Sequence, residues 1–364
     1  MKILAMYLPQ YHEIKENNEW WGEGYTEWTA VKRGKPLFKG HRQPNIPLND
    51  NYYDLSDENA IAWKWQVELA QEYGIYGFCV YHYWFNGKQL LEKPLEILLH
   101  HPEININYSI CWANETWTRT WYGNEKEILI KQEYGSEADW EKHFTYLLSF
   151  FKDKRYIKID NKPVLNIYRS GDIECLAEML DCWNNQAINN GFDGIYIVVA
   201  NNNGKLEERD NLVDAYYNFE PTYTLKHKLN VPQNLYYSSK ILIRRINNRL
   251  FKKKLLVTRV INSVKLSKVI NKKIEKTNKP VYRGVFTRWD NTPRMNYAGM
   301  VCKKASPELF YKNLLNIKET TSGKYSEFIY VNAWNEWGEG CYLEPDTETG
   351  YQYLEKIKEI VNGK

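Results

Sequence analysis

Short runs of consecutive apolar, β-branched and aromatic residues recur along the chain, separated by segments long enough for a helix and its loops. Continuous apolar runs of this length indicate strands buried on both faces, as in a parallel sheet covered by helices. Eight such strands are predicted, at residues 3–8, 77–83, 106–112, 163–168, 194–200, 214–219, 282–286 and 327–333. Eight strands with helical crossovers predict an α/β fold, a (β/α)8 TIM-type barrel.

Two of the intervening segments have the spacing of amphipathic helices. Residues 57–73 begin with a Ser-Asp-Glu sequence that predicts an N-terminal cap, and the pattern ends at Gly74. Residues 136–151 place Trp140, Phe144, Leu147 and Leu148 at helical spacing. The alternation of strands and helices over the whole length favours a single catalytic domain, residues 1–364.

Barrel enzymes hold their reacting groups at the C-terminal ends of the strands and in the loops that follow. Here polar and aromatic side chains gather where the apolar runs stop, and tryptophan and glutamate occur together there, which is not typical of loops. Ordinary polar loops are the alternative explanation. The residues that we expect to line a substrate cleft are Tyr7, Gln10, Trp84, Asn114, Glu115, Trp117, Arg119, Glu220, Arg288, Asp290, Trp334, Asn335 and Trp337.

The densest group is the segment Trp334-Asn335-Glu336-Trp337-Gly338-Glu339-Gly340, directly after the eighth predicted strand. Desolvation by ring faces and repulsion from a second carboxylate both raise the pKa of a carboxyl group, so one of the two glutamates can stay protonated near neutral pH. Glycoside chemistry requires such a pair, with an acid to protonate the departing oxygen and a second group as base or nucleophile. We therefore predict that Glu336 and Glu339 are catalytic. Two surface glutamates in a loop are the alternative.

A second Asn-Glu pair, Asn114-Glu115, follows the third predicted strand. Many barrel glycosidases have an Asn-Glu acid/base after strand four and a glutamate nucleophile after strand seven, whereas the pairs here follow strands three and eight. We therefore interpret Glu115 and Arg119 as groups that position the substrate, or as part of an ion pair that supports the cleft.

Composition narrows the possible classes of protein. Hydrophobic residues make up 43% and charged residues 26%, which is typical of a globular protein, and no run of 18 apolar residues predicts a membrane-spanning helix. The 14 Trp and 29 Tyr residues exceed what a core requires, so some should line a groove. The N-terminal segment lacks the pattern of a signal peptide, and the six cysteines lack zinc or disulfide spacing. These features predict a cytoplasmic protein without a metal or cofactor, since the common nucleotide-binding and metal motifs are also missing.

Residues 224–280, between the sixth and seventh predicted strands, differ from the rest of the chain. They contain sixteen lysine and arginine residues and one acidic residue, Glu275. Apolar residues such as Leu242, Ile246 and Leu255 alternate with bases that include Lys252 to Lys254, which predicts an insertion of one or two basic amphipathic helices. The helices could pack against the acidic body with the charges in water, or bind an anionic membrane surface. Nucleic acid is not expected as a partner, because no recognised nucleic-acid motif accompanies the charge.

Seven motifs are spread over the chain in a fixed order: Tyr7-Leu8-Pro9-Gln10-Tyr11-His12, Glu19-Trp20-Trp21-Gly22, Tyr25-Thr26-Glu27-Trp28, Lys35-Pro36-Leu37-Phe38-Lys39-Gly40-His41, Phe85-Asn86-Gly87-Lys88, Asp290-Asn291-Thr292-Pro293-Arg294 and Trp334-Asn335-Glu336-Trp337. Together they resemble the WbsX-like glycosyltransferases of bacterial surface polysaccharide synthesis, including O-antigen and capsule clusters. The resemblance covers nearly the whole chain except the insertion.

That family is in turn similar to glycoside hydrolase family 99, the metal-independent endo-α-1,2-mannosidases and mannanases, which are barrels that act with retention. The resemblance implies that Glu336 acts as base on the substrate 2-hydroxyl, giving a 1,2-anhydro sugar, and that Glu339 is the general acid and then the base. The expected substrate is an oligosaccharide or polysaccharide, in a surface polysaccharide or its lipid-linked precursor, met in the cytoplasm or at the inner membrane face. Hydrolysis, glycosyl transfer proper and a catalytically silent glycan-binding scaffold remain open at this point.

Overall fold

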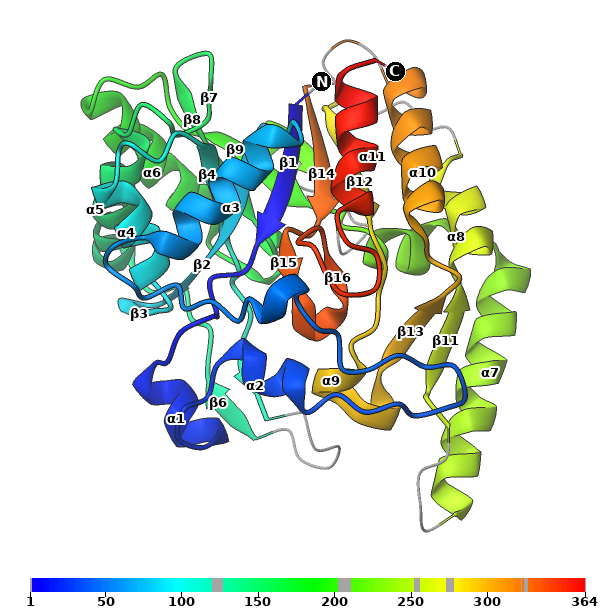
Figure 1. Ribbon diagram of the computed structural model, residues 1–364. Helices are drawn as coiled ribbons and strands as arrows, with labels where there is room; N and C mark the ends of the chain where they lie inside the picture. Colours follow the sequence, from blue (N-terminus) through cyan, green and yellow to red (C-terminus); the bar gives the residue numbers. More distant parts are fainter. Residues whose placement is uncertain are drawn as a thin grey trace.

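Eight parallel strands form a closed barrel in the computed structural model, which describes residues 2–119, 127–201, 211–251, 256–272, 278–321, 323 and 327–363. Strand β1 pairs with both β2 and β14, and these two contacts close the sheet (Figure 1). The strands are β1 (Lys2–Tyr7), β2 (Gly77–Phe85), β4 (Asn107–Trp112), β8 (Lys162–Ile167), β9 (Tyr196–Ala200), β10 (Ala215–Tyr217), β12 (Val281–Phe286) and β14 (Phe328–Asn332). Each of the eight predicted runs overlaps one of them, so the predicted (β/α)8 barrel is confirmed.

Helices surround the barrel and cover the outer faces of its strands (Figure 1). This arrangement explains the continuous apolar runs, because a strand between the barrel interior and a helix has no face in water. In β2 all nine residues are buried. The surrounding helices are α3 (Ile61–Glu72), α4 (Lys93–His100), α5 (Glu137–Phe151), α6 (Leu176–Asn189), α8 (Ser263–Ile270), α10 (Pro307–Thr320) and α11 (Gln352–Val361).

The two helices predicted from spacing both exist, but one begins later than expected. Helix α5 follows Ser136, whose side chain and that of Asp139 form a capping box. Helix α3 begins at Ile61, not at residue 57, because Ala60 adopts a left-handed conformation (φ 54°) that ends any helical path before it. The Asp57 carboxylate accepts from the Asn59 amide at 3.1 Å and from the Ile61 amide at 3.4 Å, so it forms a local turn that leads into the first residue of the helix.

Several short helices and strands lie at the C-terminal end of the barrel strands. In Figure 1, β1 points toward the end where α1, α2 and α9 lie. The loops there also contain short antiparallel pairs, because each has to return the chain over the barrel mouth. The elements are α1 (Lys15–Trp21), α2 (Glu27–Lys32), α9 (Thr292–Met295), β5 (Trp117–Thr118) with β6 (Ile128–Ile130), and β15 (Asn335–Glu336) with β16 (Cys341–Tyr342). Strand β3 (Lys88–Leu90) pairs with the end of β2, whereas β7 (Lys158–Ile159) pairs with the first residues of β8, at the opposite end of the barrel.

The segment between β10 and β12 forms a separate layer at one side of the barrel. It contains a π-helical turn (Thr224–Lys228), the long helix α7 (Val231–Leu250), strand β11 (Arg259–Asn262) and α8. Strand β11 pairs in parallel with β13 (Met300–Lys303), and a small second core forms beneath them. Residues 252–255 and 273–277 of the predicted insertion, including Lys252 to Lys254, Leu255 and Glu275, lie outside the described residues. Among the described helices, none has the length and apolar character needed to cross a bilayer.

Candidate active site

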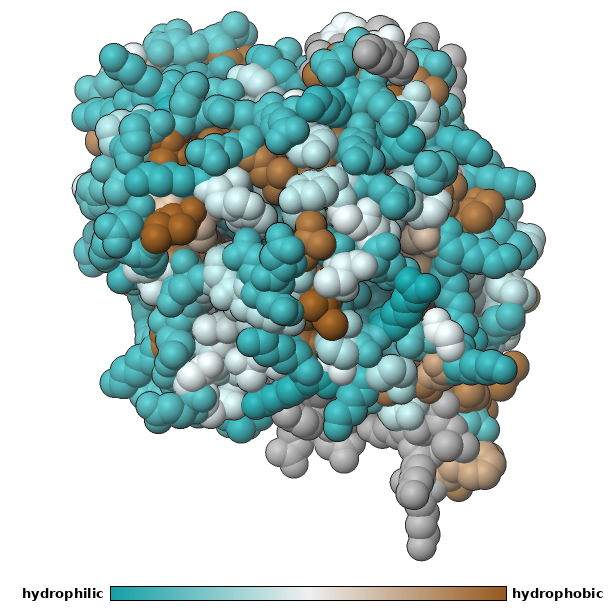
Figure 2. Space-filling view, viewed as in Figure 1, coloured by the Kyte–Doolittle hydropathy of each residue, from teal (hydrophilic) through white to brown (hydrophobic). Residues whose placement is uncertain are grey.

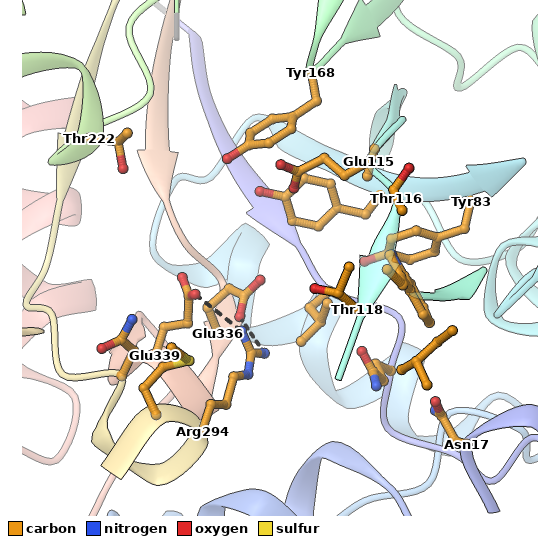
Figure 3. A pocket seen from close by; sticks show the side chains of 18 of the residues that line it. Asn17, Tyr83, Glu115, Thr116, Thr118, Tyr168, Thr222, Arg294, Glu336 and Glu339 are labelled. Atoms are coloured by element: carbon orange, nitrogen blue, oxygen red, sulfur yellow. Dashed lines mark hydrogen bonds and ion pairs between the residues drawn. The ribbon is translucent and has the colours of Figure 1, made fainter. Parts of the chain in front are cut away.

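A cavity of about 530 Å³ opens at the C-terminal end of the barrel, among the loops that follow the strands (Figure 3). Its wall combines aromatic rings with hydroxyl, amide and carboxyl groups, which is typical of a site for a polar ligand with flat apolar faces. The lining residues are Leu8, Gln10, Asn17, Trp21, Tyr81, Tyr83, Ala113, Glu115, Thr116, Trp117, Thr118, Leu129, Tyr168, Phe219, Thr222, Trp289, Asn291, Arg294, Met295, Glu336 and Glu339.

The loop after β14 is fixed to the start of the barrel by Asn335. Its side chain accepts a hydrogen bond from the Leu8 amide at 2.8 Å and donates to the Leu8 carbonyl oxygen at 3.0 Å. The Tyr11 hydroxyl donates to the Asn335 carbonyl oxygen and accepts from the Trp337 amide at 3.3 Å. The side chain of Asn335 therefore extends the contact between β1 and β14 beyond the ends of these strands, and Glu336 follows it in a defined position.

Beneath this loop a buried polar network holds Trp337. The indole N–H donates to the Glu344 carboxylate at 2.6 Å, and the ring stacks on Tyr342 with centroids 3.7 Å apart. Gln66 donates to Glu344 at 2.8 Å and accepts from the Tyr7 hydroxyl at 2.7 Å. Every member of this chain of contacts is buried, so the loop that follows β14 rests on a rigid base.

Arg294 joins three carboxyl groups at the wall of the cavity. Its guanidinium lies 2.9 Å from Glu336, 3.2 Å from Glu339 and 2.8 Å from Glu27 (Figure 3 shows the first two pairs). Glu27 is fully buried, whereas Glu339 retains 21% of its side-chain exposure and faces the cavity. The same guanidinium therefore holds both of the predicted catalytic glutamates, and it lines the cavity beside them.

Two residues place this guanidinium and its partners. Asp290 accepts from the amide and hydroxyl of Thr292 at 3.0 and 2.6 Å, which starts α9 and aims Arg294 at the cavity. The Asp290 amide donates to the Glu339 carbonyl oxygen at 2.7 Å. Glu27 is the first residue of α2, and its amide donates to the Gln10 carbonyl oxygen at 3.0 Å. The cluster is thus built from loops that follow β1, β12 and β14.

Gly338, between the two glutamates, lies against this cluster, and replacing it with alanine should destabilise the protein. A Cβ atom there would lie 1.8 Å from Glu27 Oε1 and 2.7 Å from Arg294 Nε, so the buried carboxylate would have to leave its guanidinium. Breaking a buried ion pair costs about 3 kcal/mol or more. Gly338→Ala should therefore lower the melting temperature followed by circular dichroism, with a smaller loss when it is added to Glu27→Ala. Equal losses in both backgrounds would mean that this contact is unimportant.

The charges of the cluster do not balance when all three glutamates are ionised, because Arg294 supplies one positive charge. Burial, together with the nearby charge of Glu336, raises the pKa of Glu339 to about 8, although Arg294 opposes the shift. Burial also raises the pKa of Glu27. Glu339 is therefore protonated at neutral pH, beside a carboxylate and an arginine. Across the described residues, no three His, Cys, Asp or Glu side chains are grouped so that they could hold a metal ion.

The structure brings five of the residues predicted from the sequence to one cavity: Gln10, Glu115, Trp117, Glu336 and Glu339. Glu115 and Arg119 do not pair with each other. Glu115 forms an ion pair with Arg169, and Arg119 lies 3.2 Å from Glu127, outside the cavity lining.

Three residues predicted to line the cleft point away from it. Tyr7 lies in the core beneath the cavity, stacked on Trp63. Trp84 points outward and stacks on His143, with centroids 4.5 Å apart and nearly parallel planes. Asn114 is buried, and its amide donates to the Arg169 carbonyl oxygen at 2.9 Å. These three residues do lie at or just after strand ends, as predicted. Their side chains, however, pack within the protein and do not line the cavity.

The other predicted residues outside the cavity lining shape the loops around it. Glu220 is buried and accepts from the Thr224 hydroxyl at 2.7 Å. Arg288 forms an ion pair with Asp346 and lies over the Tyr342 ring. Asp290 organises α9 as described above. Trp334, Asn335 and Trp337 are buried and anchor the loop that contains Glu336 and Glu339.

Sequence reasoning missed Arg294 and Glu27 as part of the site, together with the aromatic lining residues Trp21, Tyr81, Tyr83, Tyr168, Phe219 and Trp289. A signal for the first two was present, because both belong to motifs that also contain aromatic or turn residues, Tyr25-Thr26-Glu27-Trp28 and Asp290-Asn291-Thr292-Pro293-Arg294. Only the fold shows that these two motifs meet.

Comparison of this chain with known proteins shows the family to which it belongs and solved structures of similar fold. Residues 3–357 match the model of the family described as "Glycosyltransferase WbsX". A relative from Xanthomonas campestris pv. campestris, named "Uncharacterized protein WxcX", is 31% identical over 365 residues, which cover 99% of this chain and 49% of the relative. The chain thus spans about half the length of the curated relatives that it matches.

Solved structures of similar fold belong to glycoside hydrolases. The GH99 endo-alpha-mannosidase from Bacteroides thetaiotaomicron superposes with a TM-score of 0.59 at 12% identity, covering 99% of this chain and 96% of that one. A structure described as "Glycoside hydrolase-like protein" superposes with a TM-score of 0.59 at 13% identity, covering 98% and 93%. At this identity the likeness concerns the fold.

Proposed function

The chain belongs to the WbsX glycosyltransferase family, and from this membership and the Glu336–Arg294–Glu339 cluster we propose that it cleaves or transfers glycosidic bonds with retention. Family and fold together support a carbohydrate-active enzyme that acts on glycans. The observation on which the finer proposal depends is the pair of glutamates three residues apart, held by one guanidinium at the wall of an aromatic cavity.

In the proposed reaction Glu336 removes the proton of the substrate 2-hydroxyl, and the resulting oxygen attacks the anomeric carbon as the bond to the leaving oxygen breaks. Glu339, which holds a proton at neutral pH, transfers it to that leaving oxygen. Glu339 then takes a proton from an incoming water or sugar hydroxyl, which opens the 1,2-anhydro ring, and Glu336 returns its proton to the 2-oxygen. Two inversions at the anomeric carbon give net retention.

The proposed substrate is an oligosaccharide or polysaccharide, as part of a bacterial surface polysaccharide or its lipid-linked precursor. The rings of Trp21, Trp117, Tyr83 and Trp289 around the cavity suit the apolar faces of sugar rings. We place the reaction in the cytoplasm or at the inner face of the membrane, where such precursors are assembled.

Product analysis in H₂¹⁸O tests this proposal and separates its forms. The protein is incubated with lipid-linked and polymeric glycans of its host, and the products are analysed by mass spectrometry. Label at new reducing ends identifies an endo-acting hydrolase, and unlabelled glycans of altered length identify transfer. Binding of oligosaccharides without any change in length would contradict the proposal and indicate a glycan-binding scaffold.

The acid role of Glu339 predicts that activity is lost at alkaline pH. Because its pKa is raised to about 8, the proton that it must donate is present below that pH and absent above it. We expect kcat/KM to fall by about tenfold for each pH unit above about pH 8. Activity that persists undiminished well above that pH would contradict the assignment.

The raised pKa of Glu339 also predicts how the stability of the folded protein changes with pH. The folded protein keeps the Glu339 proton to a higher pH than the unfolded chain does, so its contribution to stability is complete at acid pH and is lost as the pH rises through about 8. The free energy of unfolding of Glu339→Gln, measured with a denaturant, should therefore change less with pH than that of the wild type. A loss of stability at alkaline pH that is caused by Glu339 should be absent from this variant, whereas a loss with another cause should occur in both proteins.

A further inference from the structure

Helix α7 presents an apolar surface that the rest of the described chain leaves uncovered. None of its twenty residues is buried, and its large apolar side chains are among the most exposed in the molecule. Leu235, Leu242, Ile246 and Leu250 follow one another at intervals of four and seven residues, so they lie on one face. Their exposures range from 49% to 76%, and Ile243 beside them is 62% exposed. Figure 2 shows hydrophobic atoms over the lower part of this helix.

Basic side chains border this apolar face on both sides. Lys240 lies toward one edge and Arg245 and Arg249 along the other, and all three are exposed, whereas the half-buried Arg244 lies on the attached side near Tyr237. Helix α7 contains no acidic residue, and Glu275 is the single acid in residues 224–280. An apolar stripe between two basic edges is the pattern of helices that lie in the plane of an anionic membrane interface.

The opposite face attaches α7 to the protein and so fixes which side faces outward. Tyr237 packs against the small core formed by Ile261, Leu266 and Met300, and Ile241 is half-buried. Asn248 accepts from the Leu256 amide at 3.0 Å, which ties the end of the helix to the following chain. The apolar face therefore points away from the barrel because of contacts on its other side.

We propose that the outward face of α7, defined by Leu235, Leu242, Ile243, Ile246 and Leu250, inserts into the interfacial region of a bilayer that contains anionic lipids. Exposed apolar surface of this kind marks an interaction site, and the basic edges match an anionic surface. A second copy of the chain fits less well, because face-to-face packing of two α7 helices would bring six like charges together, Lys240, Arg245 and Arg249 of each copy. Nucleic acid would leave the apolar stripe without a partner.

The orientation of α7 relates this surface to the cavity. In Figure 1 the helix extends along the side of the barrel and reaches beyond the strands at the end where they terminate. The cavity opens at that same end. A membrane bound by α7 would therefore run along the side of the barrel and past the end at which the cavity opens, which suits a glycan carried on a lipid. This last step rests on the proposed function, whereas membrane binding itself does not.

Liposome flotation of the full chain tests the inference. Vesicles of phosphatidylcholine with about one third phosphatidylglycerol are compared with vesicles of phosphatidylcholine alone. We expect binding to the anionic vesicles only, with at least a tenfold loss in the variant Leu242→Gln, Ile246→Gln, Leu250→Gln. Replacing Arg245 and Arg249 with glutamine should weaken binding by about fivefold for each charge.

A matched control carries three similar substitutions elsewhere on the surface, at Ile61, Ile188 and Val361, which are 65%, 57% and 43% exposed. This control should float like the wild type, and thermal melts should show that all variants remain folded. Equal binding to neutral vesicles, unchanged binding of the α7 variant, or a dimer that only this variant loses would each overturn the inference. Glu339→Gln should float normally, so failure of the chemistry and failure of membrane binding can be told apart.

Discussion

Replacing Glu339 with glutamine is expected to lower the turnover of a glycan with an unactivated leaving group by about 10³-fold, and to slow an activated aryl glycoside much less. The reason is the proposed proton: Glu339 faces the cavity and has a pKa raised to about 8, so it can protonate a poor leaving group at neutral pH. A good leaving group departs without that proton, and an added nucleophile such as azide should restore the second step. Measurement of kcat/KM on both substrates gives the ratio.

Glu336→Gln should behave differently, with a loss of about 10³-fold on both substrates, because the base that activates the 2-hydroxyl is needed whatever the leaving group is. Glu115→Gln is the matched control, since Glu115 lines the same cavity but pairs with Arg169. The Glu115→Gln substitution should lower turnover by less than about tenfold. Equal losses for Glu339→Gln on both substrates would show that this residue is not the acid.

Arg294→Met should produce the second large effect, on both stability and activity. The substitution removes the single positive charge that contacts Glu27, Glu336 and Glu339, and an uncompensated buried charge costs about 3–5 kcal/mol. The free energy of unfolding measured in urea should fall by about that amount. Because a carboxylate left in the core causes the loss, adding Glu27→Gln should recover part of it.

The pH profile separates a positioning role for Arg294 from a purely structural one. Arg294 lowers the pKa of Glu339, so removing its charge should move the alkaline limit of activity to higher pH. Arg294→Lys keeps the positive charge but loses the planar guanidinium with its paired N–H donors. It should therefore shift the alkaline limit of activity less than Arg294→Met does, while still lowering kcat. An unchanged pH limit in Arg294→Met, despite lost stability, would mean that the arginine acts only as support.

The barrel could be predicted because its signal is local. Each strand is buried on both faces, so each appears in the sequence as an uninterrupted apolar run that can be counted without knowing its neighbours. The position of Glu336 and Glu339 at one cavity could be predicted for the same reason, since they lie three residues apart in one loop, whereas their catalytic role stays a prediction.

The arrangement of side chains at the strand ends could not be predicted in this way. Adjacent strand residues point to opposite faces, so an error of one position exchanges the cavity for the outer layer. Tyr83 lines the cavity, whereas Trp84 next to it stacks on His143 beneath the helices. Arg294 and Glu27 were missed because their contact spans 267 residues and depends on where two loops end.

The attachment of Asn335 to Leu8 has a consequence for biosynthesis. These two residues are 327 positions apart, and both hydrogen bonds of the amide depend on the last barrel strand reaching the first. Loop closure over such a distance comes late in folding, because local helices and neighbouring strands form at a lower entropic cost. During synthesis the first strand emerges long before its final partner. A nascent chain therefore has no complete cavity wall until β14 and the loop after it, which contains Glu336 and Glu339, have left the ribosome.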